Sequence, residues 1–204
     1  PVNQPEVGRA TKGAAQSILG MTYMWEKKWG EAKAQFDAVV GSGKYALNAR
    51  FSDNFSATRG RNSKEGILEV QQSVNDGTTD NGNNGDVLNF PYNGGPAGCC
   101  GFHQPSQELV NSYKVDANGL PLLDTFNNSD FKSDDGLSSS DPFTPDVTTA
   151  VDPRLDRTVG RRGVPYRDWG VMPGKLWIRD QSYAGPYVPI KNTHDVAEAG
   201  SLVT

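Results

Sequence analysis

The sequence predicts a mostly α-helical fold, in which a helix pair is followed by long irregular loops and a few short strands. Apolar residues recur at helical spacing over residues 9–28 and again over residues 31–40. The 204 residues include 23 glycines and 13 prolines, and only 35% are hydrophobic. Such a composition is typical of a chain with much loop and a smaller amount of regular structure.

The helix pair has the spacing of a tetratricopeptide repeat. Leu19 and Tyr23 lie one turn apart on the first helix, and Gly20 lets a second helix approach closely. On the second helix Ala32 is the small contact residue, and Phe36 fills the space between the helices one turn later. These positions predict a tetratricopeptide-like helix pair over residues 9–45.

A single repeat leaves apolar faces uncovered, because such units need roughly three or more stacked neighbours for stability. We therefore expect degenerate partner repeats or burial against the rest of the protein. The chain begins at Pro1 without an initiator methionine, so we expect it to be the middle of a longer polypeptide. Repeats of this type are binding scaffolds, and a peptide-binding or assembly module is one functional hypothesis.

Beyond the helix pair, the periodic signals are short. Leu68, Val70 and Val74 alternate with polar residues and predict a half-buried strand. Residues 107–113 predict another helix, with Ser106 as its N-cap.

The second half of the chain has little periodicity. Residues 127–146 are rich in Ser, Asp and Asn and poor in apolar groups, which predicts a mobile surface excursion. From Thr158 onwards the chain is dense in glycine, proline and aromatic residues.

Net charge, the length of apolar runs and cysteine content argue against nucleic-acid binding, a membrane span and a redox or metal site. The net charge of −4 disfavours a polyanionic partner such as nucleic acid. No apolar run approaches the roughly 20 residues of a membrane span. Cys99 and Cys100 are adjacent, and neighbouring residues close only a strained ring. We therefore expect two small semi-buried thiols in a tight turn rather than a redox or metal site.

Several motifs, taken in order, resemble the SusD/RagB family. They are the sequence GRATKGAA at residues 8–15, SGKY at 42–45, GILEVQ at 66–71, QPSQELV at 104–110, DPRLD at 152–156, VGRRGVPY at 159–166, DWG at 168–170, WIRD at 177–180 and GPY at 185–187. The resemblance implies that residues 1–204 are the central part of one SusD-like domain. Within it, residues 9–45 form the helix pair, 46–126 a strand, an aromatic loop and a helix, and 127–204 a loop-rich segment.

The resemblance also implies a function. Members of this family are outer-membrane lipoproteins of Bacteroidetes-type bacteria, exposed at the cell surface. They capture glycans or other nutrients and cap a TonB-dependent transporter of the SusC type. The lipid anchor that would attach the protein to the membrane is not present in this chain. We expect no cofactor.

The segment expected to bind the ligand is residues 86–102. Asn89, Phe90, Tyr92 and Asn93 place aromatic rings and amides together beside a Gly-Gly sequence. Sugar C–H faces pack on aromatic planes, and sugar hydroxyls need amide or carboxylate partners. Phe90 and Phe102 equally suit a role in anchoring the loop onto the helices, whereas the hydroxyl of Tyr92 suits a half-exposed position in the site.

Trp169 and Trp177 are a second candidate pair for ligand binding. Their surroundings are rich in glycine and charged residues, a composition that also suits a structural clasp. Because this run is common in the family that the chain resembles, we favour the clasp.

No arrangement of residues predicts catalysis or a metal site. Asp152 precedes a proline and is interpreted as a helix cap, and Asp134 lies in the predicted excursion, where burial would not tune its pKa. His103 and His194 belong to no triad or metal pattern. We therefore expect no enzymatic activity.

Three arginines offer charges for an acidic sugar. Arg154, Arg161 and Arg162 are interspersed with aspartates, so pairing with those aspartates is the favoured interpretation over ligand binding. Starch-like, xylan-like, host-glycan and peptide ligands all remain open.

Overall fold

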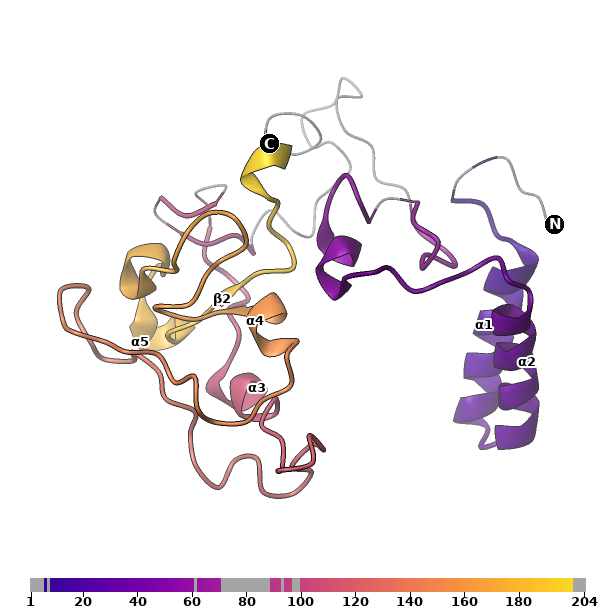
Figure 1. Cartoon of the computed structure of the whole chain (residues 1–204), viewed down its shortest axis with the longest axis horizontal. Coiled ribbons are helices and arrows are strands. Elements are labelled where there is room, and N and C mark those ends of the chain that lie inside the picture. Colours follow the sequence, from indigo (N-terminus) through magenta and orange to yellow (C-terminus); the bar gives the residue numbers. More distant parts are fainter. Residues whose placement is uncertain are drawn as a thin grey trace. The chain divides into compact units, whose positions relative to one another are not determined.

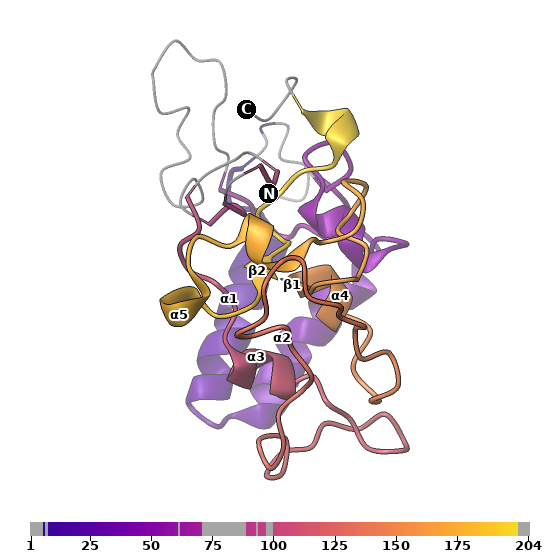
Figure 2. The ribbon, with the colours of Figure 1, turned by 90° about the vertical axis from the view of Figure 1, so that its left-hand side faces the viewer.

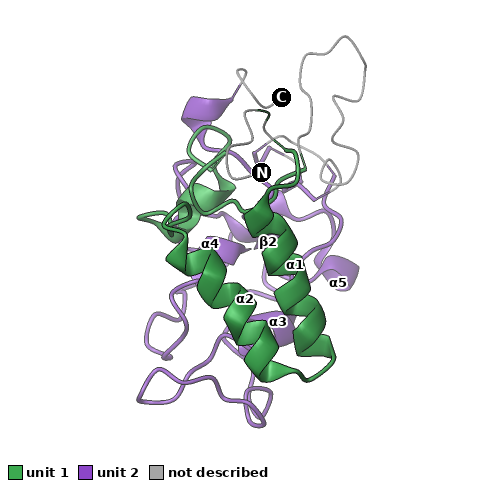
Figure 3. Ribbon diagram, turned by 90° about the vertical axis from the view of Figure 1, so that its right-hand side faces the viewer, with its two compact units in different colours: residues 1–77 green, residues 78–204 purple. Residues whose placement is uncertain are grey.

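The structure is a computed structural model, and it describes residue 6 and residues 8–60, 62–70, 89–92, 94–96 and 100–199. The chain divides into two compact units, residues 1–77 and residues 78–204 (Figure 3). Helices are the main regular structure of the described residues, and the strands are short (Figure 1). None of the helices described is long and apolar enough to cross a membrane.

A helical hairpin dominates the first unit. Helix α1 spans Lys12–Trp25 and helix α2 spans Trp29–Gly41, and the two run side by side (Figures 1 and 3). Helix α1 is shorter than the predicted 9–28 because Thr11 is its N-cap and accepts a hydrogen bond from the backbone N–H of Ala14 at 3.1 Å. At the other end Lys27 has a φ of 60°, which a continuing helix does not allow.

Close packing at Gly20 holds the hairpin together. A Cβ atom added to Gly20 would lie 2.7 Å from the Phe36 ring, so the ring rests on the glycine as the sequence predicted. Ala14 and Ala32 are 1% and 3% exposed. Leu19, in contrast, is 40% exposed within this chain. A helix pair is therefore present, whereas the tetratricopeptide architecture remains a prediction.

The chain after the hairpin folds into turns instead of the predicted strand. Phe51–Phe55 forms a 3₁₀ helix, η1. Leu68 and Val70 belong to no strand, and Val74 lies outside the described residues. The Glu69 carboxylate accepts a hydrogen bond from the Asn62 N–H at 3.1 Å, which turns this segment back on itself.

The second unit consists of short elements joined by long loops. Its α-helices are α3 (Gln107–Asn111), α4 (Leu155–Thr158) and α5 (Gln181–Ala184). Two 3₁₀ helices, η2 (Gly174–Trp177) and η3 (Val196–Glu198), accompany them. Strands β1 (Val159–Gly160) and β2 (Val188–Pro189) pair antiparallel, with Val159 opposite Pro189 and Gly160 opposite Val188 (Figure 2).

Two hydrophobic clusters form the core of this unit. The first contains Val110, Phe131, Leu155, Val159 and Tyr187, and the second contains Tyr166, Met172, Ile178, Val188 and Ile190. Because strand β1 contributes to the first cluster and strand β2 to the second, their pairing joins the two clusters. The core is thus assembled from residues far apart in the sequence.

Helix α3 confirms the helix predicted from residue 107, with Ser106 as its N-cap. The Ser106 hydroxyl accepts a hydrogen bond from the Leu109 N–H at 3.1 Å. Asn111, at the end of the helix, is 2% exposed and donates to Asn127 and Asp130. The helix therefore positions the beginning of the segment 127–146.

The segment 127–146, predicted to be a surface excursion, is exposed or half-buried except at two buried residues. Phe131 is 3% exposed and lies in the first cluster, and Asp134 is 1% exposed. Arg162 donates hydrogen bonds to the carbonyl oxygens of Ser138, Ser139 and Asp141. Polar composition suggested exposure, but these side chains and carbonyl groups are used inside the fold.

Candidate functional site

The described part of the predicted ligand loop has one backbone hydrogen bond to another segment and one between its own two ends. The Tyr92 N–H donates to the Trp177 carbonyl at 2.8 Å, and the Gly101 N–H donates to the Phe90 carbonyl at 3.1 Å. Phe90 and Tyr92 are half-buried. Asn89 is also half-buried, and its Oδ1 is buried without a hydrogen-bond partner among the described residues. Asn93 lies outside the described residues.

A cation lies over the aromatic rings of this loop. The guanidinium carbon of Arg179 is 5.5 Å from the centre of the Tyr92 ring and 5.0 Å from that of Phe102. These distances are those of cation–π contacts. Phe102 is 42% exposed, so the group lies at the surface. Sequence reasoning did not identify Arg179 as part of this site, because 77 positions or more separate it from the two rings.

Gly101 permits this arrangement. Its φ of 71° is in the left-handed region, where a side chain is strained. An added Cβ atom would lie 3.0 Å from the Cβ of Arg179 and 3.1 Å from the Cβ of Tyr92. The glycine therefore allows the loop and the arginine to approach closely, and it is the one local signal in the sequence for this contact.

Trp169 and Trp177 both pack against the second hydrophobic cluster and are half-buried. The Trp169 indole N–H donates to the His194 carbonyl at 2.8 Å. The Trp177 ring meets the ring of Tyr166 edge to face, with 5.2 Å between the centroids. The structure thus separates their roles: Trp177 adjoins the ligand loop through its backbone, and Trp169 fastens the segment that contains His194.

Cys100 differs from the predicted thiol, because it is disulfide-bonded. No described cysteine is a free thiol. The other cysteine of the sequence, Cys99, lies outside the described residues. The expectation of two thiols is therefore wrong for Cys100. That expectation rested on the preference of cysteine for small buried sites, which does not predict whether a cysteine forms a disulfide.

Two arginine–aspartate pairs fix turns of the loop-rich unit. Arg161 is 5% exposed and bonds both carboxylate oxygens of Asp156, at 2.8 and 3.0 Å. Arg154 similarly bonds Asp152 through its Nε at 2.9 Å. This bond and the backbone N–H of Arg154 lower the pKa of Asp152 to about 2. These arginines are occupied by aspartates, as the interspersed charges predicted.

The expectation that burial would not affect the pKa of Asp134 is wrong. Burial raises the pKa of this carboxyl group, although Arg162 lies 3.7 Å from its Oδ2 and opposes the shift. The same Oδ2 is buried without a hydrogen-bond partner among the described residues. The space around Asp134 has no room for a water-sized molecule.

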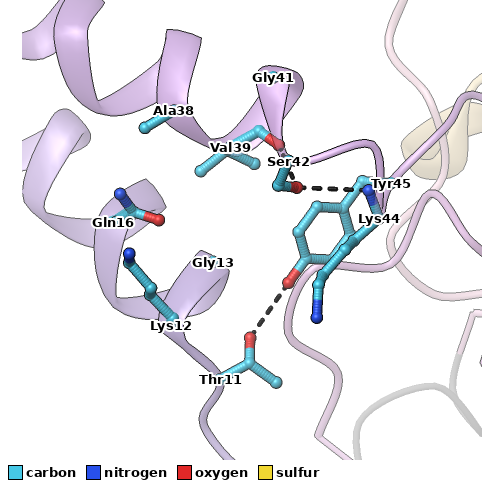
Figure 4. A pocket seen from close by; sticks show the side chains of 10 residues that line it. All are labelled: Thr11, Lys12, Gly13, Gln16, Ala38, Val39, Gly41, Ser42, Lys44 and Tyr45. Atoms are coloured by element: carbon cyan, nitrogen blue, oxygen red, sulfur yellow. Dashed lines mark hydrogen bonds between the residues drawn. The ribbon is translucent and has the colours of Figure 1, made fainter. Parts of the chain in front are cut away.

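A separate recess occurs on the helical hairpin, between the beginning of α1 and the end of α2 (Figure 4). It encloses about 530 Å³. The Thr11 and Tyr45 hydroxyls lie 3.1 Å apart at its edge, and the Lys44 N–H donates to Ser42. This recess belongs to residues 1–77, whereas every predicted ligand residue belongs to residues 78–204.

The described residues offer few candidates for a metal site or for acid–base catalysis. They contain no group of three or more His, Cys, Asp or Glu side chains arranged to hold a metal ion. His194 is 6% exposed, and burial lowers its pKa. Its ring packs against Trp169, with 5.6 Å between the centroids, which gives it a structural role.

Comparison with known proteins gives one family. A model of the SusD family matches residues 64–196, which is more than half of the chain. This range includes both hydrophobic clusters and all residues predicted to bind ligand. No curated protein matches the chain.

Proposed function

The chain belongs to the SusD family, and on this basis we propose that it captures a glycan, or another nutrient, at the bacterial cell surface without catalysis. It delivers this ligand to a TonB-dependent transporter of the SusC type. Family membership by itself implies a role in nutrient or glycan binding, and proteins of this family are typically associated with the outer membrane. The lipid anchor and surface exposure are parts of the proposal.

The observation that carries this proposal is the aromatic surface at Tyr92. Tyr92 is half-buried, and the neighbouring Phe102 is 42% exposed, so aromatic area remains accessible next to the polar residues of the loop. Aromatic faces of this kind match the C–H faces of sugar rings. The backbone bonds of Tyr92 and Gly101 hold the surface in place before any ligand binds.

Asn89 adds a polar group to this surface. An amide offers one acceptor oxygen and two N–H donors, which suits the hydroxyl groups of a sugar. Its Oδ1 is buried without a hydrogen-bond partner among the described residues, so the amide must turn outwards to meet a ligand hydroxyl. The combination of an aromatic face and an adjacent amide supports binding and offers no nucleophile or general acid.

The test is retention of the whole protein on immobilised polysaccharides, with analysis of the eluate for cleavage products. Tyr92→Ala should weaken retention while changing the free energy of unfolding by no more than about 1 kcal/mol, as expected for a half-exposed side chain. Tyr183→Ala is the matched control, because Tyr183 is 64% exposed in the same unit and lies outside the loop. Unchanged binding by Tyr92→Ala would remove this loop from the site, and cleavage products would refute the non-catalytic role.

A peptide-binding module is the second candidate function, and the hairpin favours it. Met21, Trp25 and Trp29 are 56%, 86% and 59% exposed, which leaves an apolar surface on the two helices. Such a surface suits the apolar side chains of a peptide. Binding of peptides that is lost in Trp25→Ala and retained in Tyr92→Ala would support this function over glycan capture.

A further inference from the structure

We propose that Arg179 binds the anionic group of an acidic glycan, a carboxylate or a sulfate, at the surface formed by Tyr92 and Phe102. This inference rests on the proposed function and names the class of glycan. It also adds a specificity-determining residue that lies outside the predicted loop. The arginine supplies the charge, and the two rings supply the surface and the orientation.

The Arg179 guanidinium lies over two aromatic rings, 5.5 Å and 5.0 Å from the centres of Tyr92 and Phe102. The guanidinium is planar, and its N–H donors form a fork that matches the two oxygens of a carboxylate or the oxygens of a sulfate. The rings restrict the long side chain, so less conformational entropy is lost when a ligand binds.

Among the described residues, Arg179 has fewer internal partners than other arginines of this unit. Arg154 and Arg161 bond aspartates, and Arg162 bonds three carbonyl oxygens. The hydrogen bond of Arg179 is a long one, 3.4 Å, from its Nη1 to the Cys100 carbonyl. Within the described residues no carboxylate pairs with Arg179, and the side chain is exposed.

The nearest acidic residue in the sequence has another role. Asp180 is the N-cap of α5, and its Oδ1 accepts a hydrogen bond from the Ser182 N–H at 2.9 Å. Lys175 also acts on the Asp180 carboxylate and favours its charged form. The Asp180 carboxylate therefore interacts with the beginning of α5 and with Lys175. The N–H donors of Arg179 are left available to a ligand.

The charge of the whole chain favours recognition of an acidic glycan at one local cation. The net charge is −4, so a polyanion is repelled by the protein in general. An acidic glycan that binds must do so through a local cationic group. Arg179 supplies such a group next to the aromatic surface, where a sugar ring and its acidic substituent are recognised together.

The experiment compares matched polysaccharides on the whole protein. Dextran sulfate is compared with dextran, and polygalacturonate with its methyl-esterified form. We expect tighter binding of at least one charged form, and Arg179→Gln should weaken that binding by about tenfold or more. Arg179→Lys retains the charge without the planar fork and should recover part of the loss. Arg157→Gln, a change of an exposed arginine on α4, should leave binding unchanged.

The outcomes separate this inference from the proposed function. Preference for polygalacturonate identifies a carboxylate, and preference for dextran sulfate identifies a sulfate. Equal binding of charged and neutral forms refutes the inference, as does full binding by Arg179→Gln.

If a neutral glycan binds and Tyr92→Ala abolishes that binding, the capture function stands without the acidic specificity. Absence of binding to every polysaccharide refutes both. The comparison of matched forms needs only the wild-type protein, so it decides the question even if a variant does not fold.

Discussion

The helical hairpin and the loop-rich unit achieve order by different means. In the hairpin, a few small residues allow two regular helices to pack closely, as Gly20 does beneath Phe36. In the second unit, regular elements are short, and buried polar side chains bond the backbone of distant loops. The Asn111 side chain accepts a hydrogen bond from the Phe131 N–H, and Arg162 donates one to the Ser138 carbonyl, each at least 20 positions away. The hairpin thus depends on spacing within the sequence, and the second unit depends on contacts that only the folded chain provides.

This difference explains why the proposed binding surface lies in the second unit. Helix packing uses small and apolar residues, so it leaves few polar groups in fixed positions. Loops held by buried hydrogen bonds present side chains in fixed positions without regular structure, which is the usual way in which a scaffold supports a binding surface. The Tyr92, Phe102 and Arg179 group is of this second type.

The largest effect is expected for Leu155→Ala. Leu155 is 0% exposed in the first hydrophobic cluster, and removal of such a side chain costs about 2–5 kcal/mol. Peptide-resolved hydrogen exchange should show faster exchange across residues 155–190 and unchanged exchange across residues 12–41. Leu123→Ala is the control, since Leu123 is 79% exposed. Equal loss of protection in both regions would show that the two units unfold as one, which would contradict their separate modes of stabilisation.

A smaller effect is expected for Gly20→Ala in the hairpin. The added Cβ atom would lie 2.7 Å from the Phe36 ring, and the resulting overpacking should cost about 1–2 kcal/mol after the gain in helix propensity is subtracted. Gly30→Ala is the matched control, because nothing lies within 4 Å of its added Cβ atom. The helical circular dichroism signal during unfolding would report both variants. If Gly20→Ala stabilised the hairpin as much as Gly30→Ala, close packing at Gly20 would be refuted.

The smallest effect is a change in pH dependence caused by Asp134→Asn. Burial raises the folded-state pKa of Asp134 above that of the unfolded chain, so protonation favours the folded state. Its favourable contribution is present below the unfolded-state pKa of about 4 and is lost as the pH rises through the folded-state pKa. The variant should therefore lose less stability than the wild type between pH 4.5 and pH 7.

The measurement is the free energy of unfolding of both proteins at the two pH values. Asp152 acts in a lower range, since its pKa is about 2 and its contribution is lost only as the pH falls below about 4. Asp135→Asn is the control, because Asp135 is the exposed neighbour of Asp134. An identical pH dependence in Asp134→Asn and the wild type would show that the buried carboxyl group does not titrate in this range.

The sequence by itself determined the helices and their caps. The spacing of Gly20 and Phe36 predicted the hairpin, and Ser106 marked the beginning of α3, because these signals act over three to about 16 positions. The succession of motifs also indicated the family that residues 64–196 confirm. In the candidate site, the sequence drew attention to Tyr92 through its aromatic and amide neighbours.

Only the tertiary structure decided which polar residues are buried and which charges meet. Nothing in the polar segment 127–146 indicates that Asp134 is 1% exposed, because its burial depends on Arg162 and Gly174 far along the chain. The absence of the predicted strand at Leu68 and the disulfide bond of Cys100 also depend on contacts that local sequence patterns do not reveal. Arg179 joins Tyr92 and Phe102 for this reason too: periodicity describes one element at a time, whereas a binding surface forms where separate loops are brought together.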